Sequence, residues 1–355
     1  MTGKTYRIAV IPGDGIGQEV IPVGQHAAEA VADVHGFAIE WQSFDWSCQR
    51  YAETGRMMPE DGIEEIKGFD AIYLGAVGWP GVPDHVSLWG LLIPLRRELD
   101  LYANVRPVRL LQGITSPLAG RGPEDIDFIV VRENVEGEYS EVGGRLYHGS
   151  DHEMASQLSI FTRRGVDRIL DYAFELARKR KRRHVTSATK SNGIVHTMPY
   201  WDERFAAAAA RFPDIETAQY HIDILTAHFV QHPDWFDVVV ASNLFGDILS
   251  DLGPAVAGSI GIAPAANLNP TREFPSLFEP VHGSAPDIAG QGIANPIAAV
   301  WTAAMMLDHL GESDAAAALE RAMEAALADP TTRTRDLGGS ADTGACGEAL
   351  LRAIR

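Results

Sequence analysis

The sequence is poor in cysteine and in positive charge, and it contains no long apolar run. Its 355 residues include only Cys48 and Cys346, enough for one disulfide and too few for a cysteine-ligated metal site. So few cysteines are typical of a reducing compartment, and the short apolar stretch near the N-terminus does not fit a signal peptide. We therefore expect a cytoplasmic protein.

Positive charge is scarce as well. The chain carries 30 Lys and Arg against 48 Asp and Glu, a net charge of −18. This balance argues against a nucleic-acid partner and against binding to an anionic membrane. No stretch reaches the roughly 18 uninterrupted apolar residues of a membrane span. An anionic substrate would need a local cluster of arginines, because the overall field repels it.

The sequence does contain a regular alternation of strand-like and helix-like segments. The strand-like segments are 6–11, 38–46, 70–78, 125–134, 184–190 and 236–243, and the main helix-like ones are 18–34, 165–179, 199–212 and 313–330. This alternation predicts an α/β fold with a largely parallel sheet, and the length favours two lobes. Residues 136–150 break the pattern and are predicted to form a hairpin excursion.

Two conspicuous motifs have ordinary explanations. "GDGIG" (13–17) follows a strand, but Gln18 stands where a dinucleotide fingerprint needs glycine, so a Gly-rich turn is the preferred interpretation. The basic run 178–184 could be a nucleic-acid patch. It lies where a helix is expected to end, and cations are favourable at a helix C-terminus. We therefore predict a solvated helix end.

Three arginines are candidates for anion binding: Arg96, Arg106 and Arg132. Arg106 precedes Pro107 and must be extended, and Arg132 ends a predicted strand. A planar guanidinium suits a carboxylate. A surface ion pair explains any one of them, whereas the three together favour dicarboxylate binding.

Asp247 and Asp251 stand four residues apart on one face of a predicted helix. Like charges at this spacing destabilise a helix by a few tenths of a kcal/mol. Capping explains one of them well and both less well, so capping and metal binding remain open. Asp223 is a third carboxylate in an apolar context. Three carboxylates without Cys or His suit Mg²⁺ or Mn²⁺.

The stretch 279–296, "EPVHGSAPDIAGQGIANP", is rich in small residues and opens an apolar helix. Small residues let backbone N–H groups approach a phosphate, and Asp287 could hold a ribose hydroxyl while repelling a 2′-phosphate. By itself this is a loop with nucleotide-compatible chemistry.

Taken together, several motifs resemble one family, the metal-dependent β-decarboxylating 2-hydroxyacid dehydrogenases, which act on isopropylmalate, isocitrate, homoisocitrate, tartrate or D-malate. The resemblance covers nearly the whole chain and is carried by "IPGDGIGQEV", "ANVRPVR", "VVRENVEGEYS", "ATKSNG", "SNLFGDILSDLG", "FEPVHGSAPDIAGQGIANP" and "TRDLGG". Two stretches, 69–90 and 274–288, are most similar to the tartrate and D-malate branch.

The resemblance implies the isocitrate/isopropylmalate dehydrogenase-like fold, which is α/β but not Rossmann, with two domains and a central mixed sheet. It implies a discontinuous cofactor domain, 1–101 plus 258–355, and a substrate, metal and dimerisation domain, 102–257. It also implies a homodimer with shared active sites.

Site roles follow from the same resemblance. Arg96, Arg106 and Arg132 would bind the substrate carboxylates, and Tyr139 would transfer protons together with Lys190 of the partner subunit. Asp247 and Asp251 would hold Mn²⁺ or Mg²⁺ together with Asp223 of the partner subunit, and K⁺ is a further expected cofactor. NAD, favoured over NADP by Asp287, would be bound by Glu279, His282, Gly283, Ser284, Ala285, Asp287 and Asn295.

The implied activity is oxidation and oxidative decarboxylation of a small 2-hydroxy diacid, D-malate or tartrate. The segment preceding Arg96 is expected to select the substrate, and a polar Ser87 suits a small or hydroxylated substituent. Leu88, Leu91 and Leu92 could instead form an apolar pocket, so 3-isopropylmalate remains an alternative. A catalytically inactive nucleotide- or metal-binding member is a second alternative.

Overall fold

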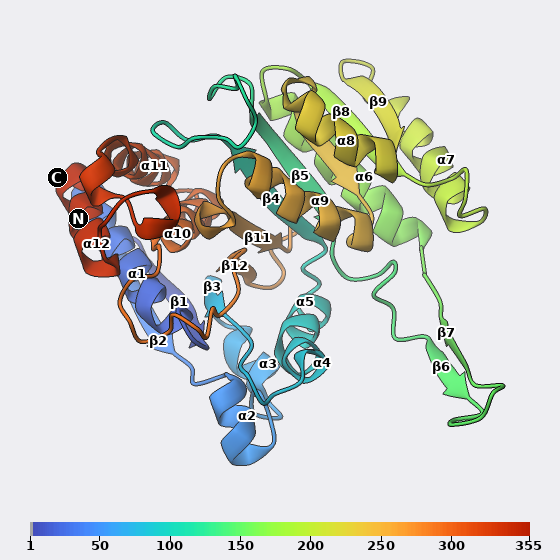
Figure 1. Ribbon diagram of the computed structural model, residues 1–355, viewed down its shortest axis with the longest axis horizontal. Coiled ribbons are helices and arrows are strands. Elements are labelled where there is room, and N and C mark those ends of the chain that lie inside the picture. The colour runs from blue at the N-terminus through green and yellow to red at the C-terminus, as the bar shows by residue number, and fades with distance from the viewer. Residues whose placement is uncertain (1–2) are drawn as a thin grey trace.

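A ten-stranded sheet runs through the computed structural model, which describes residues 3–355 (Figure 1). Its order is β2-β1-β3-β12-β11-β4-β5-β10-β8-β9, and β6 and β7 form a separate pair. The strands are β1 (Thr5–Gly13), β2 (Ala38–Ser43), β3 (Ala71–Ala76), β4 (Ala103–Arg109), β5 (Asp127–Glu133), β6 (Gly143–Leu146), β7 (Met154–Gln157), β8 (His184–Thr189), β9 (Glu216–His221), β10 (Val238–Ala241), β11 (Pro264–Leu268) and β12 (Ser276–Pro280).

The two outer parts of the sheet are parallel, as the alternation predicts. The centre is different, because β11 is antiparallel to both β12 and β4, and β4 is antiparallel to β5. The sheet is therefore mixed, as the resemblance implies. Each strand predicted from the alternation is present. The central strands β4, β11 and β12 were missed because polar residues, among them Arg106, Asn267 and Glu279, interrupt their apolar pattern.

Helices cover the sheet, and the first and last parts of the chain lie side by side in Figure 1. They are α1 (Gly17–His35), α2 (Cys48–Thr54), α3 (Gly62–Ile66), α4 (Asp84–Ser87), α5 (Ile93–Glu98), α6 (Arg163–Lys179), α7 (Thr197–Ala209), α8 (Ile222–Gln231), α9 (Asn243–Val256), α10 (Ile297–Leu310), α11 (Ser313–Ala328) and α12 (Thr343–Ile354). Helix α10 is apolar all round because it packs against the sheet, α1 and α11. Among residues 3–355 no helix has the length and apolar character needed to cross a bilayer.

The basic run 178–184 ends a helix, as predicted. Helix α6 stops at Lys179, and the guanidinium of Arg178 binds the carboxylate of Asp214 at 2.8 Å. Arg180 pairs with Asp127 at 3.0 Å. The run is mostly exposed, and two of its arginines form ion pairs with other segments of the same chain.

The predicted excursion is a hairpin that projects from the body of the molecule (Figure 1). All residues of β6 and β7 are exposed, including Leu146 and Met154, and Tyr147 at the turn is 65% exposed. An isolated two-stranded hairpin is only marginally stable in water. Apolar side chains exposed in this way are typical of a protein–protein contact.

Candidate active site

Three buried arginines line one cavity of about 160 Å³ at the centre of the sheet. Arg96 comes from α5, Arg106 from β4 and Arg132 from β5. Burial lowers the pKa of Arg106 and takes that of Arg132 to about 10. A buried guanidinium is costly unless an anion accompanies it. The structure therefore brings the three predicted arginines together in a setting that suits carboxylates.

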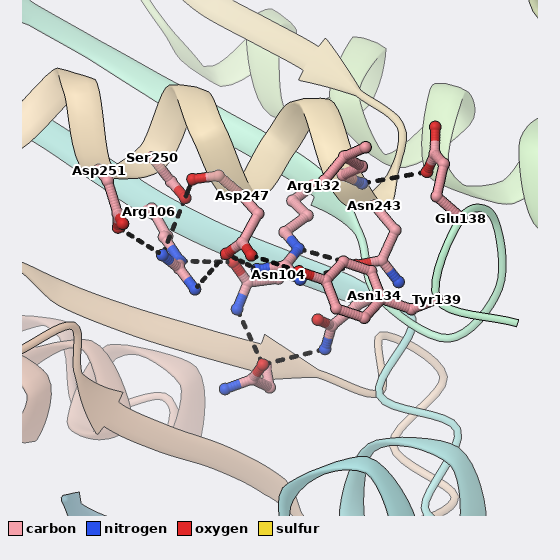
Figure 2. A network of polar contacts seen from close by, with 12 residues as sticks. Asn104, Arg106, Arg132, Asn134, Glu138, Tyr139, Asn243, Asp247, Ser250 and Asp251 are labelled. Carbon is pink, nitrogen blue, oxygen red and sulfur yellow. Dashed lines mark hydrogen bonds and ion pairs between the residues drawn. The ribbon is translucent and has the colours of Figure 1, made fainter. Parts of the chain in front are cut away.

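The aspartate pair lies beside these arginines on α9 (Figure 2). The carboxylate of Glu138 caps this helix, because it accepts hydrogen bonds from the Ser242 hydroxyl at 2.7 Å and the Leu244 N–H at 3.0 Å. Helix α9 begins at Asn243 and has no acidic residue in its first turn. Capping as an explanation for Asp247 and Asp251 is therefore wrong.

Asp247 is held by two groups of the cavity. Its carboxylate forms an ion pair with Arg132 and accepts a hydrogen bond from the Tyr139 hydroxyl at 2.8 Å. Burial acts to raise the pKa of Asp247, but the charges of Arg132 and Arg106 outweigh it and the pKa ends below its usual value. Burial and the neighbouring Asp247 raise the pKa of Tyr139. Asp247 is thus ionised and Tyr139 keeps its proton.

Asp251 has a more open setting than Asp247. Its carboxylate lies 3.6 Å from the Arg106 guanidinium, and its side chain is 64% exposed. Burial of its inner part raises the pKa of Asp251. The two carboxylates share one helix face, with one side of Asp251 left free for a further partner.

Gly246 allows α9 to lie this close to β5. A Cβ at this position would stand 2.5 Å from the Arg132 Cβ. Real Cβ atoms do not approach this closely, so a larger residue would push the helix away from the strand. The ion pair between Arg132 and Asp247 depends on this contact.

Lys190 and Asp223 form a second, separate group. The Lys190 Nζ donates to the Asp223 carboxylate at 2.7 Å, and this hydrogen bond lowers the pKa of Asp223. The Asp223 side chain is 67% exposed. Within residues 3–355, no three His, Cys, Asp or Glu side chains gather so as to hold a metal ion. One chain therefore offers two carboxylates of suitable chemistry on α9, and Asp223 is not gathered with them among the described residues.

The predicted cofactor loop borders the arginines through Glu279. Its carboxylate accepts a hydrogen bond from Arg96 at 3.0 Å, and a second cavity of about 160 Å³ is lined by Glu279, His282, Gly283, Arg96 and Arg106. Burial lowers the pKa of His282, and its Nε2 has no hydrogen-bond partner in the described part of the chain. A neutral imidazole with an open buried nitrogen fits a nucleotide that supplies the missing partner.

The rest of the loop lies beside the glycine-rich turn. The Ser284 carbonyl accepts the Ile16 N–H at 2.9 Å, so "GDGIG" is a turn between β1 and α1, as predicted, and it touches this loop. Ala285 has a positive φ of 41°, and Asp287 is exposed. The Asn295 amide donates to Asp336 at 2.9 Å.

Ser87 is not brought to either cavity. It is buried, and its hydroxyl donates to the Asp84 carbonyl at 3.0 Å within the same helical turn. Leu88 and Ile93 line the arginine cavity instead. A role for Ser87 in substrate choice stays a prediction.

Sequence reasoning missed a set of residues that support the site. The Arg97 guanidinium donates to the Tyr139 carbonyl at 2.8 Å and lies 4.9 Å from the Trp89 ring centre. Three buried asparagines, Asn104, Asn134 and Asn267, form a hydrogen-bonded network beneath the arginines. The sequence signal that could have found these supporting residues is a polar residue inside an otherwise apolar strand segment.

The sequence profile described as Isocitrate/isopropylmalate dehydrogenase matches residues 7–350. The chain belongs to this family. The expected isocitrate/isopropylmalate dehydrogenase-like fold is thereby confirmed.

Relatives in the isocitrate/isopropylmalate dehydrogenase family match along the full length. The chain is 59% identical over 358 residues to the decarboxylating D-malate dehydrogenase of Escherichia coli (strain K12), covering 99% of each. It is 58% identical to the tartrate dehydrogenase/decarboxylase of Pseudomonas putida, covering 99% of this chain and 98% of that one. A crystal structure of isocitrate dehydrogenase from Methylococcus capsulatus has a TM-score of 0.89 at 34% identity, covering 99% of both chains.

Proposed function

We propose that this protein is a NAD-dependent, metal-dependent decarboxylating dehydrogenase that oxidises a small 2-hydroxy diacid, D-malate or tartrate. The carrying observation is the cavity in which three buried arginines meet the Asp247–Tyr139 pair. The relatives named for D-malate and tartrate support this substrate class over 3-isopropylmalate. The residues needed for catalysis are present, which argues against an inactive member.

Members of the isocitrate/isopropylmalate dehydrogenase family use a divalent metal and NAD. Asp247 and Asp251 would hold the ion, Mn²⁺ or Mg²⁺, and K⁺ would be an additional cation. A divalent ion bound there polarises the oxygens of the substrate and makes its hydroxyl more acidic. Asp287, in the exposed part of the 279–295 loop, would favour NAD because it repels a 2′-phosphate.

The chain's own residues supply binding and proton transfer. Arg96, Arg106 and Arg132 would hold the two carboxylates and present the C2 hydrogen to the nicotinamide. Lys190 of the partner subunit would take the hydroxyl proton as hydride leaves C2. After CO₂ leaves, Tyr139 would protonate the product carbon, since it keeps its proton beside Asp247.

A homodimer with shared sites would complete the metal ligands. Four apolar side chains on α8 and α9 are 38–46% exposed, namely Ile224, Val230, Leu244 and Ile248. The β6–β7 hairpin exposes further apolar residues. We propose that these surfaces contact a second copy and bring Asp223 and Lys190 of the partner subunit to Asp247. In this arrangement 102–257 is the substrate and dimer domain, and 1–101 plus 258–355 the cofactor domain.

The test is NADH production with Mn²⁺ on D-malate, the tartrate stereoisomers and 3-isopropylmalate. We expect turnover of D-malate or a tartrate, lost on chelation of the metal and restored by adding it back. Turnover of 3-isopropylmalate alone would replace the proposed substrate class. No turnover of any of them, with NAD still bound, would favour a binding protein.

A further inference from the structure

A buried chain of amide side chains connects the cofactor side of the site to the substrate cavity, and its hydrogen-bond direction is determined. The carboxylate of Glu279 can only accept, so the Asn267 Nδ2, 2.8 Å away, donates to it. The Asn267 Oδ1 must then accept. It receives the Nδ2 hydrogens of Asn104 at 2.8 Å and of Asn134 at 2.9 Å.

The two asparagines at the end of this chain differ in one respect. Asn104 uses its oxygen to accept from the Arg106 Nε at 2.9 Å. The Asn134 amide nitrogen donates hydrogen bonds to the Asn267 Oδ1 and to the Leu101 carbonyl, at 2.9 Å each. Its Oδ1 is left without a hydrogen-bond partner among residues 3–355, although Asn134 is only 4% exposed. The amide cannot turn over to relieve this, because both neighbours of its nitrogen are acceptors.

The free oxygen belongs to a residue of the substrate cavity. Asn134 directly follows β5, two positions after Arg132, and both residues line the same cavity. Asn134 lines the cavity together with Arg106, Arg132 and Tyr139. Figure 2 shows Asn134 close to Tyr139. A buried acceptor without a donor is unfavourable, and it is expected to find its donor in a bound ligand. The arginines account for the carboxylates of a hydroxy diacid, so the donor that such a ligand has left to offer is a hydroxyl.

This inference rests on the proposed function. The C2 hydroxyl of the substrate is the one that loses its proton, on the side of Asp247 and Asp251, so it is not the lasting donor. We propose that Asn134 is a specificity-determining residue whose Oδ1 accepts a hydrogen bond from a hydroxyl on C3 of a 2,3-dihydroxy diacid. A monohydroxy diacid such as D-malate leaves that place to water, for which a cavity of about 160 Å³ has room.

The test compares kcat/KM of wild type and Asn134→Leu on tartrate and on D-malate. We expect kcat/KM for tartrate to fall roughly 10-fold more than kcat/KM for D-malate, which is the worth of a neutral hydrogen bond, because loss of the Asn134 amide nitrogen affects both substrates alike. Equal losses on both substrates, or no loss on either, would overturn the proposal. If Asn134→Leu does not fold, Asn134→Ala serves, since it also removes the oxygen and creates no bulk.

Asn104→Ala is the matched control from the same network. It removes the acceptor that orients Arg106, so we expect equal losses on tartrate and D-malate. Wild-type enzyme that turns over neither substrate would contradict the proposed function rather than the role of Asn134. If wild type oxidises D-malate but not tartrate, tartrate is measured as a competitive inhibitor. Its Ki should rise roughly 10-fold in Asn134→Leu, and an unchanged Ki would reject the role.

Discussion

Asp247 on α9 is paired with Arg132 on β5, across a helix–strand contact that only a glycine at position 246 allows. The pair connects the predicted metal face of α9 to the predicted carboxylate-binding arginines. The Arg132 guanidinium is itself fixed by the Asn243 side chain, which accepts from its Nη2 at 2.7 Å. The Arg132–Asp247 ion pair and the close contact at Gly246 therefore lie at the same place in the fold. A substitution of Asp247 changes the charge alone, and a substitution of Gly246 changes the packing alone.

Asp247→Asn keeps the shape of the side chain and removes its charge. We expect metal-dependent turnover to fall by at least roughly 100-fold, since metal stabilisation is worth several kcal/mol, while NAD binding stays close to wild type. NADH formation across a Mn²⁺ titration and a fluorescence titration with NAD measure the two quantities. Full activity in this variant would end the metal-site proposal.

Gly246→Ala changes packing and leaves every charge in place. Its Cβ would meet the Arg132 Cβ at 2.5 Å, so we expect a loss of about 1–3 kcal/mol in the free energy of unfolding and a lower kcat/KM. Gly344→Ala on α12 is the control, because its Cβ meets only the Asp342 carboxylate at 3.5 Å. Urea denaturation distinguishes them. Equal stability of the two variants would show that the α9–β5 contact is not tight.

Co-expression of Lys190→Ala and Tyr139→Phe chains tests whether sites are shared between subunits. If Lys190 of the partner subunit acts beside Tyr139, a mixed dimer has one site with both residues intact. Random pairing then restores about a quarter of wild-type activity, although each variant alone is inactive. If both residues acted within one chain, the mixture would stay as inactive as its components.

Arg97→Leu removes the donor to the Tyr139 carbonyl and the stacking on Trp89. We expect kcat to fall roughly 10-fold with a smaller change in KM, since the loop that carries the proposed acid loses a charged hydrogen bond. Arg163→Leu, at a residue whose side chain is 76% exposed, is the control and should match wild type. A pure KM effect would assign Arg97 to substrate binding instead.

The lowered pKa of the buried His309 makes the folding stability depend on pH. Burial and the nearby charge of Arg272 lower the pKa of His309 to about 4, whereas an unfolded histidine has a pKa of about 6.5. Between these values the unfolded chain binds more protons, so stability falls as the pH drops from about 6.5 towards 4. His309→Leu should lose less stability than wild type between pH 7.5 and pH 5, measured by urea midpoints. His152→Leu, at an exposed position, should behave as wild type does.

Most outer strands and the longest helices could be predicted because their residues follow one rule each, whereas the edge strand β9 and the shorter helices α8 and α12 were missed. β3 and β10 are buried throughout and read as apolar runs, and α6 shows apolar residues at helical spacing. β4, β11 and β12 could not be read in this way. The active site requires polar residues at these buried positions, so they do not follow the apolar pattern of a strand. Sequence rules are expected to fail at such functional positions.

Residue types and their spacing along the chain were enough to predict the α/β class, the family, the three arginines and the acidic pair. Three-dimensional contacts were needed to show that Glu138 rather than Asp247 caps α9, that Ser87 does not line the arginine cavity, and that the Asn134 oxygen has no hydrogen-bond partner among residues 3–355. The Glu138 cap and the asparagine network join residues more than 100 positions apart in sequence. The direction of a hydrogen bond depends on every partner in its network. Which groups are partners in space cannot be read from the order of residues along the chain.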